Sequence, residues 1–347
     1  ELPPLPWADA VAARWASSLG DTPEFEAIML TLSHSLTGST ADNYGTHWAR
    51  FVRWCGQQPD QPSPLPATTP TVLRWLAGDV TARDTVRAGS LQPYLSALNR
   101  VHTDLDLEPP ALGHVVRQYR RGLAHRQGGD GRAARRVYLP PPIVEQVLIW
   151  ALRLDLKVAT PRARAAFRAA TATVFTFCFF ARGATGAALR AEHVRHSVTG
   201  STVTLESEKG KAQSWDSRTF TLPPGAVPGL ADLLSKWEAF RGRCKPRDSY
   251  YALPGERRRT FPASQVDTWL REILAHLDVQ PPAGELWSGH SLRKGAASGA
   301  AAIGVALDRI CWCGGWSVHG KAVHDYIDPT CPSSAAGRRF FGWLLPT

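Results

Sequence analysis

Helical hydrophobic patterns fill the first third of the chain after an opening stretch without a period. Residues 1–22 are rich in Pro and show no clear apolar repeat, so we expect an arm there. From residue 23 to 126, four or five short helical patterns are separated by Pro and Gly, which predicts a small all-α bundle. One pattern forms an apolar stripe of Tyr44, Trp48, Phe51, Val52 and Cys55, with Arg50 and Arg53 on other faces.

The rest of the chain mixes helical patterns with one short β segment. Residues 127–140 contain Gly-Gly, Asp-Gly and Pro-Pro-Pro, which interrupt regular structure and predict a linker. Helical patterns then run through residues 141–347, except where β-branched residues alternate in STVTLES and SRTFTLP around the polar turn EKGKAQSWD. We therefore expect a second, mainly helical domain that contains a small antiparallel β-sheet.

Composition narrows the class of partner. The chain has 347 residues, 44% of them hydrophobic, enough to fill the cores of one large or two ordinary domains. Lys and Arg number 40 against 30 Asp and Glu, a formal net charge of +10, which favours nucleic acid, a heparin-like polymer or an anionic membrane. The sequence shows neither an apolar run of about 18 residues nor a secretory signal pattern. Nucleic acid is therefore the favoured partner, and no membrane is expected.

The cysteines and histidines give little support for disulfides or metal. Six scattered cysteines are too few for a disulfide scaffold and favour a reducing, intracellular compartment. Cys311 and Cys313, with His319 and His324 nearby, lack the usual spacing of a zinc site. We expect no metal, and we expect a location on DNA, in the nucleus if the source is eukaryotic and otherwise in the cytoplasm or nucleoid.

Basic side chains gather before and within the linker. Between Arg117 and Arg136 there are seven Arg and one acid, Asp130. Beside DNA such a run would neutralise phosphates and make affinity fall with salt, whereas the alternative is a solvated connector with incidental charge. Together with two arginines of the bundle, the candidate DNA-binding residues are Arg50, Arg53, Arg117, Arg120, Arg121, Arg126, Arg132, Arg135 and Arg136.

One tyrosine and one His-Arg pair stand out near the C-terminus. Tyr326 lies in KAVHDYID, between a Gly-rich break and Pro329, whereas the other tyrosines lie in apolar or loop contexts that are ordinarily structural. His290 and Arg293, in SGHSLRKGAA, fall on one face of a helix start, where backbone N–H groups favour phosphate. Taken alone, each also has an ordinary structural explanation. Tyr326 could be a packing residue, and the His-Arg pair could occur by chance on a surface helix.

Two further cationic positions precede that pair. Arg182 directly follows the apolar run 174–181, and an anion is one reason for an Arg at the edge of a core, although it could also simply extend to solvent. Lys209 or Lys211 lies on the polar turn of the expected hairpin, from which it could reach a phosphate. Neither position indicates a site by itself.

In this order, after a helical N-terminal domain, these positions resemble the tyrosine recombinase (phage integrase) family, over roughly residues 24–330. GHSLRKGAA resembles the family's H-x-L-R motif closely. GGWS and VHDYID resemble its G-[HW]-x-S and nucleophile segments, and FARGATGAALRAEHV matches the box of the first Arg more loosely. The sequences of the segments SGHSLRKGAA and DYID are similar to those of recombinases of eukaryotic mobile elements.

The resemblance implies a fold and a reaction. The fold would be mainly α, with a core-binding, SAM-like helical bundle and a mixed catalytic domain that contains a small antiparallel β-sheet. Tyr326 would attack a DNA phosphodiester, form a 3′-phosphotyrosine and free a 5′-hydroxyl, without ATP. Strand exchange would pass through a Holliday junction, with four protomers acting on two double-stranded DNA sites.

The resemblance also implies roles for the other site residues. Arg182 and Arg293 would stabilise the phosphate oxygens, and Lys209, with Lys211 as second choice, would protonate the leaving oxygen. His290 would hydrogen-bond the phosphate or accept the tyrosine proton, and Trp316 would donate an N–H in place of the commoner His. These cations supply the positive charge that a metal would otherwise provide, so no cofactor is expected.

Two features leave alternatives open. Thr185 stands three residues after the first Arg, where the family usually has an acid, and a Thr cannot neutralise charge. This departure bears on the register of Arg182 and keeps open a DNA-binding protein of this fold without catalysis. A type IB topoisomerase, which relaxes a single duplex by similar chemistry, is the other rival.

The C-terminal segment would dock on a neighbouring protomer or pack on its own domain through Phe340, Phe341, Trp343, Leu344 and Leu345.

Overall fold

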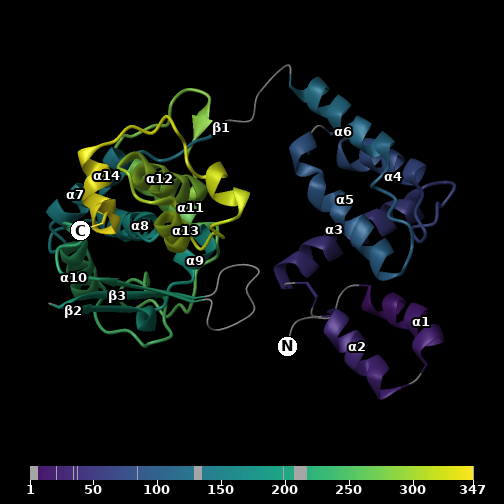
Figure 1. Cartoon of the computed structure of the whole chain (residues 1–347), viewed down its shortest axis with the longest axis horizontal. Helices are drawn as coiled ribbons and strands as arrows, with labels where there is room; N and C mark the ends of the chain where they lie inside the picture. Colours follow the sequence, from purple (N-terminus) through teal and green to yellow (C-terminus); the bar gives the residue numbers. More distant parts are fainter. Residues whose placement is uncertain are drawn as a thin grey trace. The chain divides into compact units, whose positions relative to one another are not determined.

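The computed structural model describes residues 7–20, 22–33, 35–36, 38–83, 85–128, 135–197, 199–206 and 217–346. The chain forms two compact units, residues 1–132 and 133–347, and each has its own hydrophobic core (Figure 1). The division falls within the segment 127–140 that the sequence predicts to be a linker. None of the helices in the described ranges is both long enough and apolar enough to cross a membrane.

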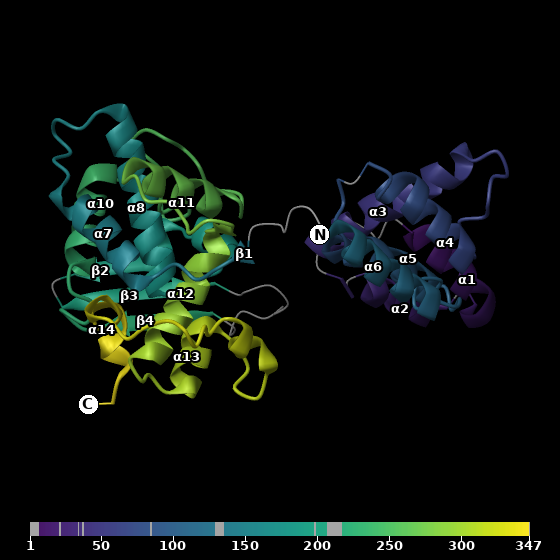
Figure 2. The ribbon, with the colours of Figure 1, turned by 90° about the horizontal axis from the view of Figure 1, so that it is seen from above.

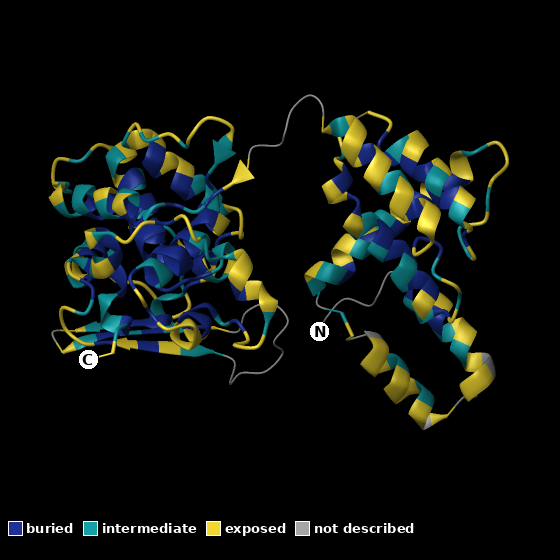
Figure 3. Ribbon diagram, turned by 45° about the horizontal axis from the view of Figure 1, so that its top comes forward, coloured by how far each residue is buried: buried dark blue, intermediate teal, exposed yellow. Residues whose placement is uncertain are grey.

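The first unit is a helical bundle in its described residues, as predicted. Most of its helices bury apolar residues in a shared core, whereas the helix over residues 23–33 leaves Ile28, Leu30 and Leu32 exposed (Figure 3). In chain order they are α1 (Ala8–Leu19), α2 (Pro23–Ser33), α3 (Gly38–Gln57), α4 (Thr69–Trp75), α5 (Gln92–Asp104) and α6 (His114–Gln127). A π-helical turn (Leu76–Val80) extends α4, and a short 3₁₀ helix (Ala88–Ser90) precedes α5.

The structure differs from the expected arm over residues 1–22, because α1 occupies most of it. Trp7 and Val11 are buried in the core of the first unit. The indole groups of Trp7 and Trp15 donate hydrogen bonds to the Asp104 carboxylate (2.9 Å) and carbonyl (3.0 Å) at the end of α5. Residues 7, 11 and 15 recur every four positions, a helical period that the neighbouring prolines obscured.

The apolar stripe of α3 is largely as predicted, with one exception. Trp48, Phe51 and Cys55 are buried, but the Val52 side chain is 38% exposed. Successive residues of a helix point about 100° apart, so Val52 cannot share the buried direction of Phe51.

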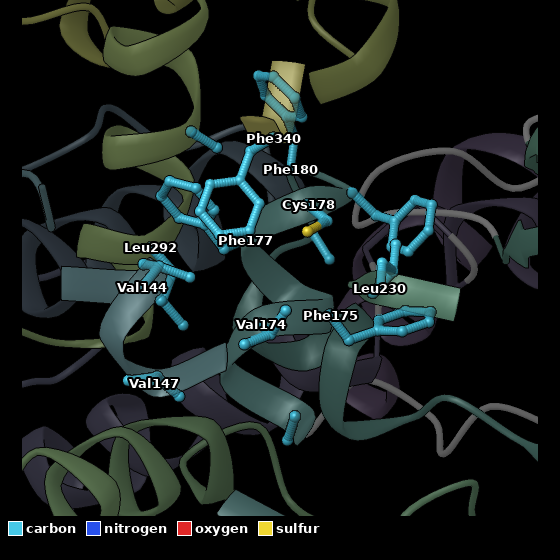
Figure 4. Close-up of a cluster of buried hydrophobic side chains, with 14 of the residues drawn as sticks. Val144, Val147, Val174, Phe175, Phe177, Cys178, Phe180, Leu230, Leu292 and Phe340 are labelled. Atoms are coloured by element: carbon cyan, nitrogen blue, oxygen red, sulfur yellow. The ribbon is translucent and has the colours of Figure 1, made fainter. Parts of the chain in front are cut away.

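The second unit is built around α8 (Pro161–Cys178), which is buried on all sides from residue 169 to 178. The helices that surround α8 are α7 (Pro141–Arg153), α10 (Leu230–Arg241), α11 (Gln265–His276) and α12 (Gly289–Ala302) (Figure 2). Phe177 of α8 packs near Phe340, and Leu292 of α12 packs near Val144 of α7 (Figure 4). The remaining helices are α9 (Gly183–Ala187), α13 (Leu307–Gly314), α14 (Ala335–Phe341) and the 3₁₀ helices Ala191–His193, Lys321–Asp325 and Gly342–Leu344.

A small antiparallel sheet completes this unit, which confirms the predicted fold class. Strands β3 (Gly200–Leu205) and β4 (Arg218–Leu222) form the predicted hairpin, with Val203 opposite Phe220. Strand β2 (Val194–Ser197) pairs with β3 on its other side and was not predicted. A second, parallel pair joins β1 (Arg135–Arg136) to β5 (Glu285–Leu286), so the end of the expected linker belongs to the second unit.

Small residues let α12 pack closely on its neighbours. A Cβ added at Gly295 would lie 2.1 Å from the Leu139 carbonyl oxygen, and one at Gly299 would lie 2.7 Å from Pro141 Cγ. The amide of Leu139 also donates to the Ser291 carbonyl at 2.9 Å. The segment between β1 and α7 is therefore fixed along the first turns of α12.

The C-terminal apolar segment packs on its own unit. Phe340 and Phe341 are fully buried against Phe177 and Phe180 of the core, and Leu344 is buried with them. Trp343 and Leu345 are half-buried, and docking of this segment on a neighbouring protomer stays a prediction.

Candidate active site

Helix α12 begins with two hydrogen-bonded amides and carries His290 and Arg293 in its first turns. The Ser288 amide donates to Ser291 Oγ at 3.1 Å, and the Gly289 amide donates to Asp267 Oδ1 on α11. Glycine at 289 is needed for this approach, because an added Cβ would lie 2.8 Å from the same carboxylate oxygen. Two of the amides at this helix start thus have acceptors.

Tyr326 is held beside α12 by its backbone. It follows the 3₁₀ helix Lys321–Asp325, and its carbonyl accepts a hydrogen bond from Ser298 Oγ at 3.1 Å. The same Oγ accepts from the Asp328 amide at 2.9 Å, and the Asp328 carboxylate lies 3.8 Å from Lys294 Nζ. Ser298 is 1% exposed, so this connection is shielded from water.

The ring of Tyr326 lies between those of His290 and Trp316. The centroid of the Tyr326 ring is 4.8 Å from the centroid of His290 and 4.8 Å from that of Trp316. The Arg293 guanidinium lies 5.4 Å from the Tyr326 centroid. The structure therefore brings together four of the predicted residues, which come from one helix and two loops.

Arg293 is fully buried despite its charge. Its Nη1 donates to the Phe180 carbonyl at 2.7 Å, and its Nη2 donates to the Gly314 carbonyl. The guanidinium carbon lies 4.1 Å from the centroid of the Trp316 ring, a cation–π distance. Carbonyl dipoles and an aromatic face thus replace the water that this cation loses.

Arg182 and Arg136 add positive charge near His290. Arg182 precedes α9 as its N-cap residue and is half-buried, whereas Arg136 is exposed on β1. The pKa of His290 lies below its ordinary value because of desolvation, and then because of Arg293, Arg136 and Arg182; Asp267 acts in the opposite direction. The imidazole is thereby favoured in its neutral form, which can accept a proton. Arg136, a candidate DNA-binding residue, is thus also one of the cations that act on His290, and its contact with DNA stays a prediction.

Lys209 and Lys211 lie outside the described residues, so the structure gives no position for the expected general acid. The strand before them ends at Leu205, and the next described strand starts at Arg218. Beside Leu205, the carboxylate of Glu206 pairs with Arg190 and lies 3.1 Å from His193 Nε2.

Thr185 opens on a small hollow next to this ion-pair group. The hollow has a volume of about 240 Å³ and is also lined by Leu189, His193, Leu205 and Glu206. Thr185 brings a hydroxyl rather than a charge to this part of α9. The acid that the resemblance leads one to expect at position 185 is therefore absent from α9.

The candidate DNA-binding arginines fall into different settings. Arg50 is engaged by the Asp79 carboxylate at 2.8 Å, and Arg135 by Glu285 at 2.9 Å. Arg117, Arg120 and Arg121 line one hollow of about 400 Å³ on α6. Arg53 and Arg126 are exposed, whereas Arg132 lies outside the described residues.

A second basic surface was missed by the sequence reasoning. The segment 241–259 contains seven basic residues and two acids, a charge bias visible in the sequence without any motif. Lys245, Arg247, Arg257 and Arg259 line a hollow of about 500 Å³ together with Glu192 and Asp248. This loop ends against α9, since the Phe261 amide donates to the Ala187 carbonyl at 3.3 Å. We call residues 243–259 the basic loop.

The described residues contain no group of three or more His, Cys, Asp or Glu side chains that could hold a metal ion. In particular, Cys311 and Cys313 are buried. Burial raises the pKa of the Cys313 thiol to about 12.

A helical bundle followed by a helical unit with a three-stranded sheet is the fold of the tyrosine recombinases. The chain is similar to XerH site-specific recombinase bound to its palindromic difH substrate in a post-cleavage complex. The TM-score is 0.58 and the identity 10%, over 93% of this chain and 91% of that chain. It is also similar to the Tn1549 transposon integrase in complex with transposon right-end DNA (TM-score 0.54, 10% identity, 92% of this chain and 94% of that chain). No protein-family model and no curated protein matches the sequence.

Proposed function

We propose that the chain is a site-specific DNA recombinase in which Tyr326 is the nucleophile. The observation that carries this proposal is the position of the Tyr326 ring between His290 and Trp316, 5.4 Å from the buried guanidinium of Arg293. A phenol is a weak nucleophile, and a nearby neutral imidazole and fixed cations are what its attack on a phosphodiester requires.

The proposed reaction conserves the phosphodiester bond energy. Tyr326 Oη attacks the phosphorus and passes its proton to His290, and the bond from phosphorus to the 5′-oxygen breaks. Lys209, or Lys211 in its place, gives a proton to that leaving oxygen. A 5′-hydroxyl from a second strand then attacks the phosphotyrosine in the reverse sense, which restores a DNA backbone and frees Tyr326.

The cations act where negative charge develops. Arg182 and Arg293 stabilise the non-bridging oxygens of the transition state, and the Trp316 N–H contributes one hydrogen bond. The guanidinium carbon of Arg293 lies 4.1 Å from the centroid of the Trp316 ring and 5.4 Å from that of Tyr326, so its charge is close to the proposed nucleophile. No metal and no ATP enter these steps.

Double-stranded DNA is the proposed partner. The hollow of Arg117, Arg120 and Arg121 and the basic loop give each unit a cationic surface suited to phosphates. The similar structures of XerH and of the Tn1549 integrase are DNA complexes by their descriptions, which supports this choice. We propose further that four protomers act on two DNA sites, exchange strands through a Holliday junction and work on DNA inside the cell.

Covalent capture tests the nucleophile. The protein is incubated with a library of nicked duplexes of randomised sequence, and adducts that survive denaturation are isolated and their DNA is sequenced. We expect an adduct with the wild type and with the control Tyr138→Phe, and none with Tyr326→Phe, although Tyr326→Phe still shifts duplex DNA in a gel. An adduct that persists in Tyr326→Phe would overturn the assignment, and loss of the wild-type adduct in EDTA would overturn the metal-free mechanism.

A second assay separates recombination from relaxation. Two duplexes that carry the captured sequence are mixed with the protein, and we expect four-way junctions between them. Relaxation of supercoiled DNA without sequence preference and without junctions would instead identify a topoisomerase.

A further inference from the structure

The structure assigns to Asp267 the positioning of the catalytic helix α12. This inference rests on the proposed function, because it concerns how His290 and Arg293 are presented to the reacting phosphate. Asp267 lies in the first turn of α11 and is half-buried. Its Oδ1 accepts a hydrogen bond from the amide of Gly289. Gly289 is the first residue of α12 and directly precedes His290.

Close packing restricts the start of α12 to this contact. A Cβ at Gly289 would lie 2.8 Å from Asp267 Oδ1 and 3.2 Å from Val266 Cγ1. The small residue and the carboxylate therefore form a matched pair across α11 and α12. Because side chains one turn apart share a helix face, a shift of this first turn would move both His290 and Arg293 relative to Tyr326.

Asp267 also supplies a negative charge near His290, where the other charged groups are arginines. The charged groups around His290 are Arg293 on its own helix, Arg136 on β1, Arg182 before α9 and Asp267 on α11. The centroid of the Tyr326 ring lies 4.8 Å from that of His290. Position 185 of α9 brings only a hydroxyl, so Asp267 is the carboxylate that opposes these guanidinium groups at His290.

The alternative is that Asp267 only stabilises its own helix. An acid in the first turn of a helix interacts favourably with the helix dipole wherever it lies, by about 0.3–1 kcal/mol. Asp308 provides the matched control, because it is an exposed acid in the first turn of α13. Asp308→Asn changes the same charge at the same kind of position, away from the start of α12.

Two substitutions at Asp267 separate the hydrogen bond from the charge. Asp267→Asn keeps an acceptor for the Gly289 amide but removes the charge, whereas Asp267→Ala removes both. We expect the His290 pKa to fall further in Asp267→Asn, since a carboxylate that favours imidazolium is lost. The pKa is read from the NMR titration of ring-labelled histidine in the full chain, which requires no DNA.

Adduct formation provides the second measurement. We expect the rate of adduct formation to fall about tenfold in Asp267→Ala and about two- to threefold in Asp267→Asn, and to stay unchanged in Asp308→Asn. In the pH profile of this rate, we expect the acid limb of Asp267→Asn to move to lower pH. An unchanged His290 titration in Asp267→Asn, or equal titration shifts in Asp267→Asn and Asp308→Asn, would overturn the inference. A wild-type rate in Asp267→Ala would overturn it as well. If the wild type itself forms no adduct, the proposed function fails, and the titration still decides the role of Asp267.

Discussion

The indole ring of Trp316 covers the guanidinium of Arg293, with 4.1 Å between the ring centroid and Cζ. Gly314 limits the position of this ring, because an added Cβ there would lie 1.8 Å from Trp316 Cζ3. Gly314 also offers its carbonyl to Arg293. One glycine thus determines where both the ring and the cation lie.

The first prediction concerns that glycine. Gly314→Ala should displace the Trp316 ring, lower the free energy of unfolding by about 1–3 kcal/mol and slow adduct formation at least tenfold, because overpacking moves the cation–π pair. Chemical denaturation and the adduct assay measure the two effects. Gly342→Ala is the control, since an added Cβ there meets nothing within 4 Å. Equal behaviour of the two variants would show that the position of Trp316 is not set in this way.

The second prediction concerns the connection between Ser298 and the Tyr326 backbone. Ser298→Ala removes the donor to the Tyr326 carbonyl and the acceptor for the Asp328 amide. We expect a loss of about 1–3 kcal/mol in stability and a several-fold slower adduct formation, because the segment that carries the proposed nucleophile gains freedom.

Thr171→Ala is the matched control for this change. Thr171 is also fully buried, and its Oγ1 donates to the Phe167 carbonyl at 2.9 Å within α8. It should cost similar stability and leave the rate of adduct formation unchanged. A rate that follows stability in both variants would argue against a specific role for Ser298.

The third prediction concerns pH and the first unit. His102 is fully buried, its Nε2 accepts from the Ala67 amide at 2.8 Å, and burial lowers its pKa. The unfolded chain therefore binds this proton more readily, and stability should fall as pH drops below about 6.5, by roughly 1 kcal/mol between pH 7.5 and 5.5.

Urea unfolding of the full chain at both pH values measures this dependence. His102→Gln should lower stability at pH 7.5 and flatten the change between the two values. His125→Gln, at an exposed histidine of α6, should keep the wild-type pH dependence. A dependence that survives in His102→Gln would have to come from another group.

The fourth prediction concerns the basic loop. Arg247, Arg257 and Arg259 are exposed, and no ion pair to them occurs within the described residues. Replacing all three by Ala should weaken duplex DNA binding regardless of sequence. The slope of log affinity against log salt should fall by about 2–3, close to 0.9 for each phosphate that the protein no longer neutralises. Arg74→Ala, which removes a cation already paired with Asp60 at 2.6 Å, should leave the slope unchanged. An unaltered slope in the triple variant would exclude the loop from the DNA interface.

Fold class and chain order were accessible from the sequence because they depend on periodicity and spacing. The alternation around EKGKAQSWD predicted β3 and β4. Long-range contacts were not accessible. Asp267 lies 22 residues before Gly289, and its hydrogen bond has no local signature.

The site was predictable only in part for the same reason. His290 and Arg293 share a helix, so their spacing was informative, whereas Arg136 reaches the neighbourhood of His290 through the pairing of β1 with β5. The helix α1 was missed because its apolar residues are few and follow prolines. The basic loop was visible as a charge bias, but its link to α9 depends on the fold.

The fixed spacing of the contacting residues along α12 restricts the insertions and deletions that the chain tolerates. His290, Lys294 and Ser298 connect this helix to the segment from Tyr326 to Asp328, and Arg293 connects it to the carbonyls of Phe180 and Gly314. Deleting a single residue between Arg293 and Ser298 would rotate Ser298 by about 100° around the helix axis while leaving the His290–Arg293 spacing intact. Natural relatives of this chain should therefore show insertions and deletions in the loops around α12, and none within it.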